Sequence, residues 1–260
     1  MPLTFAQAQF IVATSAGVAP EKLGSLTSRL KQWQKMDFPE GARGVGRGAK
    51  VEYGATQVFQ LMLMMRLLKL GTTPERAKEI IITGWDQFRH GFLEALVSHG
   101  NEEGERHYFL IQLDALSELT TPGAKHMHVV VDTVSTARLR TAWDPMGEDQ
   151  PEDEEWQMSF YYAFLVKNRL TASFVIEVDT LLYWLAMCLR EMGISAAVFA
   201  PELDSWYDEV WKGYEGEQRD EEQFTSFRNR SAVDHDVGKV DLTQFSNDAF
   251  SSILRRYTDG

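Results

Sequence analysis

The first group of candidate functional residues lies in the segment "ARGVGRGAKVEYG", residues 42–54. Its glycines could cradle a phosphate, and its cations Arg43, Arg47 and Lys50 could lie along a nucleic-acid backbone. A nucleotide-binding loop needs a strand before it and a helix directly after it. Here a helical stretch ended by proline precedes the glycines, a strand-like arm follows them, and the GKS or GKT ending of a P-loop is absent. We interpret the segment as a basic, DNA-contacting hairpin, with a plain surface loop as the alternative.

The segment before this hairpin predicts a helix–turn–helix. Residues 4–15 have the apolar spacing of a short helix, and "LGSLTSRLKQWQKM" buries Leu23, Leu26, Leu30 and Trp33 on one face. A helix about 10–12 Å wide fits the major groove of B-DNA, which is about 12 Å wide. We therefore predict that the opposite face of this helix contacts DNA through Ser25, Ser28, Arg29, Gln32 and Lys35. The hairpin is predicted to add contacts from Arg43, Arg47, Lys50 and Tyr53.

The order of these elements resembles the DNA-binding domain of the MerR family of transcription regulators. The resemblance covers residues 4–83 and is carried mainly by "VEYGATQVFQLMLMMRLLKLGTTPERAKEII". Tyr53, residues 67–71 and residues 74–80 occupy the places of the family's wing tyrosine, its "LG" link and the start of its next helix. The resemblance implies a winged helix–turn–helix that reads double-stranded DNA. Residues 84–260 show no match to the effector-binding domains of the family.

Charge is divided unevenly along the chain. Residues 1–83 hold eleven Lys or Arg and six Asp or Glu, about +5, and residues 84–260 hold fifteen and thirty-two, about -17, which together give the net charge of -12. This division indicates that the basic N-terminal part binds an anionic partner, while the acidic remainder keeps the protein soluble by repulsion between molecules. The single cysteine fits a reducing compartment, and neither a leader nor a membrane span is predicted. We therefore expect a cytoplasmic, nucleoid-associated protein of a bacterium or phage.

Residues that could support catalysis or metal binding are few. His126 and His128 alternate on a predicted strand but lack a third ligand with helpful spacing. Glu177 and Asp179 stand at a strand-to-helix junction, where capping and solvation are the expected roles. Cys188 lies among apolar neighbours and is assigned to the core. We predict no enzyme, no cofactor and no metal site.

A helix is predicted from Pro74 to about Val97. Its apolar residues recur at spacings of four, three, four and four, which suits a helix-pairing seam, either within the chain or with a second copy. The symmetric half-sites that such DNA-binding modules usually read favour a homodimer. The predicted dimerisation residues are Ile81, Trp85, Phe88, Phe92 and Leu96.

The remainder predicts a mixed domain. Segments 106–116, 125–139, 156–167 and 171–178 have the composition of strands, 179–193 that of a helix, and Trp206 and Trp211 mark a short helix. The fold class is thus α+β, with a winged helix–turn–helix at 1–75, a long connecting helix at 76–98, a dimerisation or sensing domain at 99–212 and a polar, partly disordered tail at 213–260.

These features predict a sequence-specific, double-stranded DNA-binding transcription regulator. Its C-terminal domain would dimerise or meet a small-molecule effector or a protein partner. Two alternatives stay open: a phage or mobile-element DNA-docking protein such as a small terminase subunit, and a small-molecule sensor whose N-terminal module contacts protein.

Overall fold

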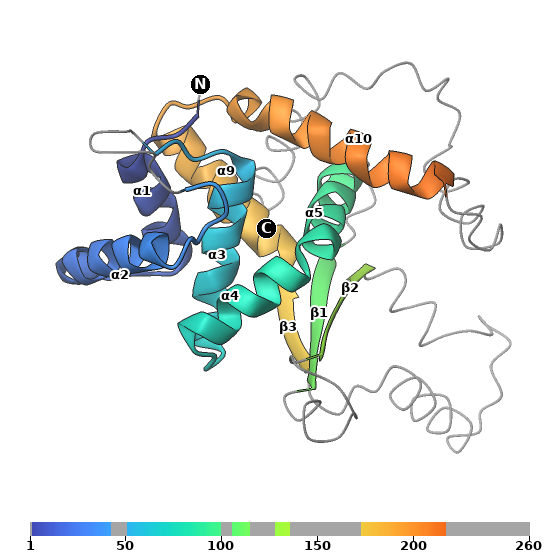
Figure 1. Cartoon of the computed structure of the whole chain (residues 1–260). Coiled ribbons are helices and arrows are strands. Elements are labelled where there is room, and N and C mark those ends of the chain that lie inside the picture. The colour runs from blue at the N-terminus through green and yellow to red at the C-terminus, as the bar shows by residue number, and fades with distance from the viewer. Residues whose placement is uncertain (1, 43–50, 100–105, 115–127, 136–172, 217–260) are drawn as a thin grey trace, which may run out of the picture.

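Helices and one small antiparallel sheet make up the residues that the computed structural model describes, which are 2–42, 51–99, 106–114, 128–135 and 173–216. The mixed α+β class is confirmed (Figure 1). The elements are α1 (Phe5–Ser15), η1 (Pro20–Lys22), α2 (Leu23–Lys35), α3 (Ala55–Lys69), α4 (Pro74–Thr83), α5 (Trp85–His99), β1 (His107–Asp114), β2 (His128–Ser135), β3 (Ser173–Glu177), α9 (Val178–Glu191), η3 (Ala196–Phe199) and α10 (Ala200–Gly216).

The sheet has the order β2-β1-β3, with β1 antiparallel to both neighbours. Phe109 of β1 pairs with Ile176 of β3, and Ile111 pairs with Val131 of β2. These four side chains are buried on the face that α5 and α9 cover. Gly91 lets α5 come close, because an added Cβ would lie 2.4 Å from the Phe109 ring. Three of the four predicted strands are confirmed, and the fourth, 156–167, lies outside the described residues.

One hydrophobic cluster runs from Leu3 to Trp206 through helices and sheet alike. An aromatic chain crosses it: the Phe59 ring of α3 stacks on Phe92 of α5 at 4.1 Å, and Phe92 meets Phe109 edge-on at 5.1 Å. α1 packs on α9, and α10 packs on α5 and α3. The boundary predicted near residue 75 therefore does not separate two cores.

The single connecting helix predicted for residues 76–98 is wrong. The chain forms α4 and α5, which change direction at Gly84 (Figure 1). Glycine is a poor helix former. A Cβ at this position would also lie 2.5 Å from the Val131 side chain of β2, so the break brings the start of α5 onto the sheet.

The apolar seam along α4 and α5 packs within its own chain. The exposed fractions of its five side chains are 0% for Ile81, 8% for Trp85, 0% for Phe88, 0% for Phe92 and 2% for Leu96. Residues buried this deeply are not available to a second copy. Their assignment as dimerisation residues is therefore wrong, and the intramolecular alternative is correct.

The C-terminal boundary is also corrected, because α10 continues to Gly216, past the predicted start of the tail at 213. Residues 217–260, including a short helix expected at 247–256, lie outside the described part. Within that part no single helix is long and apolar enough to cross a membrane. The stretches Val178–Glu191 and Ala196–Glu209 reach that length and composition only as a pair bent by 116°.

Candidate nucleic-acid interface

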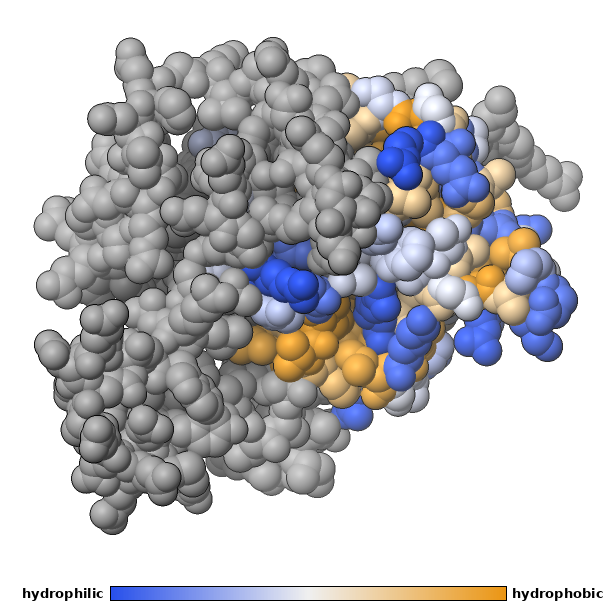
Figure 2. All heavy atoms as spheres, turned by 180° about the vertical axis from the view of Figure 1, so that it is seen from behind, coloured by the Kyte–Doolittle hydropathy of each residue, from blue (hydrophilic) through white to orange (hydrophobic). Residues whose placement is uncertain are grey.

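The five α2 residues predicted to contact DNA share one exposed face of the helix. We call this set the α2 face: Ser25, Ser28, Arg29, Gln32 and Lys35. Their spacing of three and four places them within about one third of the helix circumference. Hydrophilic residues gather at the end of the molecule where α2 lies (Figure 2, right).

The opposite side of α2 is held firmly by the core. Leu26 and Leu30 are each 3% exposed and Trp33 is 2% exposed, as the sequence predicts. Leu23, predicted to be buried, is 37% exposed, because it opens the helix directly after η1. The Gln9 amide of α1 donates to the Thr27 hydroxyl at 2.9 Å, which adds a polar link between the two helices.

The C-terminal end of α2 is closed by a Schellman motif. Asp37 adopts a left-handed conformation (φ 55°), the Phe38 N–H donates to the Trp33 carbonyl at 3.0 Å, and the Asp37 N–H donates to Gln34 at 3.1 Å. The Lys78 ammonium of α4 donates to the Met36 carbonyl. A cation near the carbonyl end of a helix is electrostatically favourable. The motif and the lysine fix where α2 ends.

The α2 face is cationic. α2 contains Arg29, Lys31 and Lys35 and no carboxylate. Within the described part of the chain, neither Arg29 nor Lys35 takes part in an ion pair. The Ser28 hydroxyl donates to the Gly24 carbonyl at 3.1 Å, which leaves its oxygen free to accept. The face thus offers donors and positive charge to an anionic surface.

Tyr53 is not part of this exposed face, and its assignment as a DNA contact is wrong. It is 1% exposed, it pairs with Leu3 in an antiparallel bridge, and its phenol oxygen accepts from the Gln34 amide. Burial raises the pKa of Tyr53, and the bond from Gln34 partly opposes that shift. The residue anchors the start of α3 to α2. The other predicted hairpin contacts, Arg43, Arg47 and Lys50, lie outside the described residues.

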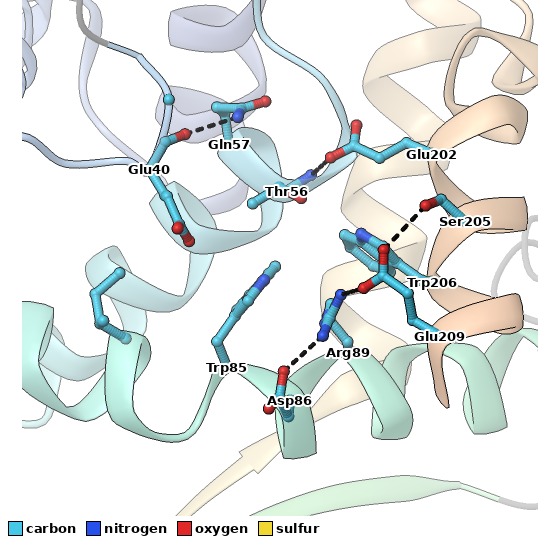
Figure 3. A pocket seen from close by; sticks show the side chains of 12 residues that line it. Glu40, Thr56, Gln57, Trp85, Asp86, Arg89, Glu202, Ser205, Trp206 and Glu209 are labelled. Atoms are coloured by element: carbon cyan, nitrogen blue, oxygen red, sulfur yellow. Dashed lines mark hydrogen bonds and ion pairs between the residues drawn. The ribbon is translucent and has the colours of Figure 1, made fainter. Parts of the chain in front are cut away.

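A pocket of about 590 Å³ opens between the turn at Glu40 and Gly41, α3, the end of α4, α5 and α10 (Figure 3). Its polar lining includes one cation, Arg89, and the carboxylates of Glu40, Asp86, Glu202 and Glu209. Trp85 and Trp206 close it from within, with ring centroids 5.6 Å apart and an edge-on angle of 88°. Because its lining carries more negative than positive charge, this side disfavours a phosphate backbone.

Arg89 ties α5 to α10 at the rim of this pocket. Its guanidinium lies 2.5 Å from the Glu209 carboxylate and 2.5 Å from that of Asp86 (Figure 3). Burial acts to lower the pKa of Arg89, but the bonds to Glu209 and Asp86 outweigh it and raise that pKa. The bond from Arg89 in turn lowers the pKa of Glu209, with help from Ser205. The Arg89–Glu209 ion pair fastens α10 across α5, and the Arg89–Asp86 pair, which lies within α5, holds the guanidinium in place.

Glu202 of α10 makes the contact that sequence reasoning missed. Its carboxylate accepts the N–H groups of Ala55 at 2.6 Å and Thr56 at 3.0 Å, the first two residues of α3. The two partners are about 150 positions apart in sequence, so no local pattern marks the pair. No local pattern marks the bonds of Gln34 to Tyr53 and of Lys78 to Met36 either, whose partners are 19 and 42 positions apart.

The residues considered as candidates for catalysis are buried or bonded within the fold. Asp179 is 1% exposed, so solvation is the wrong role, and its carboxylate accepts the His107 backbone N–H at 2.5 Å. Burial raises the pKa of the Cys188 thiol to about 11, and the side chain is 0% exposed. His126 lies outside the described residues, and within them no three His, Cys, Asp or Glu side chains are grouped to hold a metal ion.

No protein-family model matches the chain, and no curated protein or solved structure shows significant similarity to it. The resemblance of residues 4–83 to MerR regulators therefore remains a prediction from the motifs alone.

Proposed function

We propose that the protein binds double-stranded DNA through the α2 face and acts as a sequence-specific transcription regulator. The observation that carries the proposal is the division of α2 into two sides. Leu26, Leu30 and Trp33 hold one side in the core, while the five residues of the α2 face are exposed on the other. A rigidly held helix with an exposed polar, cationic side suits insertion into a major groove.

The side chains of the α2 face suit contacts both to base edges and to the phosphate backbone. Arg29 has the guanidinium geometry for O6 and N7 of guanine, and the Gln32 amide can pair with adenine. Lys35 and the two serines are suited to phosphate oxygens. The acidic pocket contains no residue of the α2 face in its lining, and its carboxylates would repel the same backbone.

The finer parts of the proposal are the wing and the dimer. The wing rests on the basic composition of residues 42–54 and on the MerR resemblance. The homodimer rests on the symmetry of the sites that such modules read, and it needs a surface other than the apolar residues of α4 and α5. A small-molecule effector or protein partner for the C-terminal part is also a proposal.

Selection from a pool of random duplexes tests the function. We expect the protein to enrich one sequence and to bind it at least about 10³-fold more tightly than random duplex at the same salt concentration. Binding without such preference would favour a DNA-docking protein of an assembly over a regulator. Absence of duplex binding at about 50 mM salt, where a cationic face acts most strongly, would contradict the proposal.

A further inference from the structure

Residues at and around the start of α3 are bonded to the end of α2 and to the turn that follows it. Gln57 donates its amide to the Glu40 carbonyl at 2.7 Å, and Gln60 accepts the Glu40 N–H at 2.8 Å. Tyr53, two residues before α3, accepts from Gln34 near the end of α2. Hydrogen bonds thus join the start of α3 to the end of α2 through Gln34 and to the turn that follows α2 through Glu40.

The N-cap residue of the first turn of α3, Gly54, has no side chain to accept the first N–H groups of this helix, and the Gln57 side chain accepts only the N–H of Gly54 itself, at 2.7 Å. The first N–H groups of a helix have no partner within the helix, and a serine, threonine or aspartate usually supplies one. Here the carboxylate of Glu202 does so from α10 (Figure 3). A Cβ on Gly54 would lie 2.1 Å from that carboxylate oxygen, so the absence of a side chain at position 54 makes room for Glu202.

Glu202 is itself held in place by the rest of α10. One turn further along, Trp206 is 3% exposed and packs on Trp85 and Phe59. Glu209 is bound to Arg89. The carboxylate is thus presented from a helix that is fixed at two other places.

We propose that Glu202 is a positioning residue for the α2 face. From the C-terminal part of the chain it fixes the first turn of α3, and through Gln57, Gln60 and Tyr53 it fixes the end of the helix proposed to read DNA. The inference rests on the proposed function. It makes duplex binding depend on a carboxylate that touches no DNA and belongs to an acidic helix.

Amide hydrogen exchange and duplex binding together test the inference in the full-length chain. In Glu202→Ala the amides of Ala55 and Thr56 lose their acceptor, and we expect them to exchange about 3- to 30-fold faster. The amides of Asp37 and Phe38, which do not touch Glu202, should also exchange faster, because the end of α2 loosens. Glu202→Gln keeps an acceptor and should give a smaller change.

Binding to the duplex selected above should weaken about three- to tenfold in Glu202→Ala, because a smaller fraction of molecules holds α2 in place. This sign is opposite to the plain charge effect, since removing a carboxylate strengthens attraction to DNA. Asp204→Asn, which removes an exposed carboxylate from the same helix, is the matched control. It should leave the four amides unchanged and should not weaken binding.

Two results would overturn the inference while leaving the proposed function intact. In the first, Ala55 and Thr56 exchange faster while Asp37 and Phe38 do not. In the second, the affinity of Glu202→Ala for the duplex equals that of Asp204→Asn at a temperature where both are folded. If the wild-type protein binds no duplex, the proposed function fails, and the inference fails with it.

Discussion

Replacing Arg29 and Lys35 together with alanine is expected to weaken duplex binding by about 10- to 100-fold. Arg29 would lose a contact to a base or phosphate, and Lys35 would lose a phosphate contact. Each lost phosphate contact also reduces the slope of log affinity against log salt by about 0.9. Fluorescence anisotropy of a labelled duplex, titrated at several salt concentrations, measures both quantities.

The free energy of unfolding shows whether this double variant binds more weakly because it has lost DNA contacts or because it has lost its fold. Both side chains are exposed, so the free energy of unfolding should stay within about 0.5 kcal/mol of the wild-type value. Lys69→Ala removes an exposed cation from the far end of α3 and is the matched control. If Lys69→Ala and the double variant weaken binding equally, DNA is attracted by positive charge in general and not by the α2 face.

Phe92→Ala is expected to lower the free energy of unfolding by about 3–5 kcal/mol, the usual cost of emptying a fully buried aromatic site. Phe92 is 0% exposed and lies between Phe59 of α3 and Phe109 of β1. Its removal would open a cavity where helices and sheet meet. Urea unfolding followed by tryptophan fluorescence measures the change.

The same variant tests whether the apolar residues of α4 and α5 pack within one chain. Ile82→Ala is the control, since Ile82 lies in the same stretch but is 41% exposed and should cost under about 1 kcal/mol. The loss in Phe92→Ala should not depend on protein concentration. A variant that stays as stable as the wild type but falls from a dimer to a monomer would contradict the packing described above.

Local sequence patterns predict the helices and strands well where one side of an element is buried. In α2, the spacing of Leu26, Leu30 and Trp33 predicts both the buried side and, by elimination, the whole α2 face. The β-branched and aromatic runs predict β1, β2 and β3 in the same way. Periodicity works here because each element has to bury one side.

Periodicity fails where the partner is distant in sequence. The spacing of Ile81, Trp85 and Phe92 fits a helix pair of any origin, and only the packing against Phe59, Phe109 and Trp206 shows that the partners are in the same chain. Gly84 lies between α4 and α5, and the lack of a side chain there leaves room for Val131 of β2, a neighbour that no local pattern shows.

In the candidate site, too, local patterns predict some features, while others depend on residues distant in sequence. The exposed residues of α2 follow from its helical period, whereas the burial of Tyr53 depends on Leu3 and Gln34. The cap of α3 comes from Glu202, which stands in an acidic segment that gives no sign of such a role. The resemblance to MerR regulators suggests the wing tyrosine as a contact but contains no information on these neighbours.

Photo-crosslinking from position 28 tests the α2 face most directly. Cys188 is the only cysteine and is buried, so Ser28→Cys places a single accessible thiol on the α2 face, to which a photoreactive group can be attached. Thr83→Cys, exposed at the end of α4, is the control. If the α2 face enters the groove, the selected duplex is cross-linked from position 28 and not from position 83. Equal cross-linking from both positions, or none from position 28 while the duplex is bound, would contradict that mode of binding.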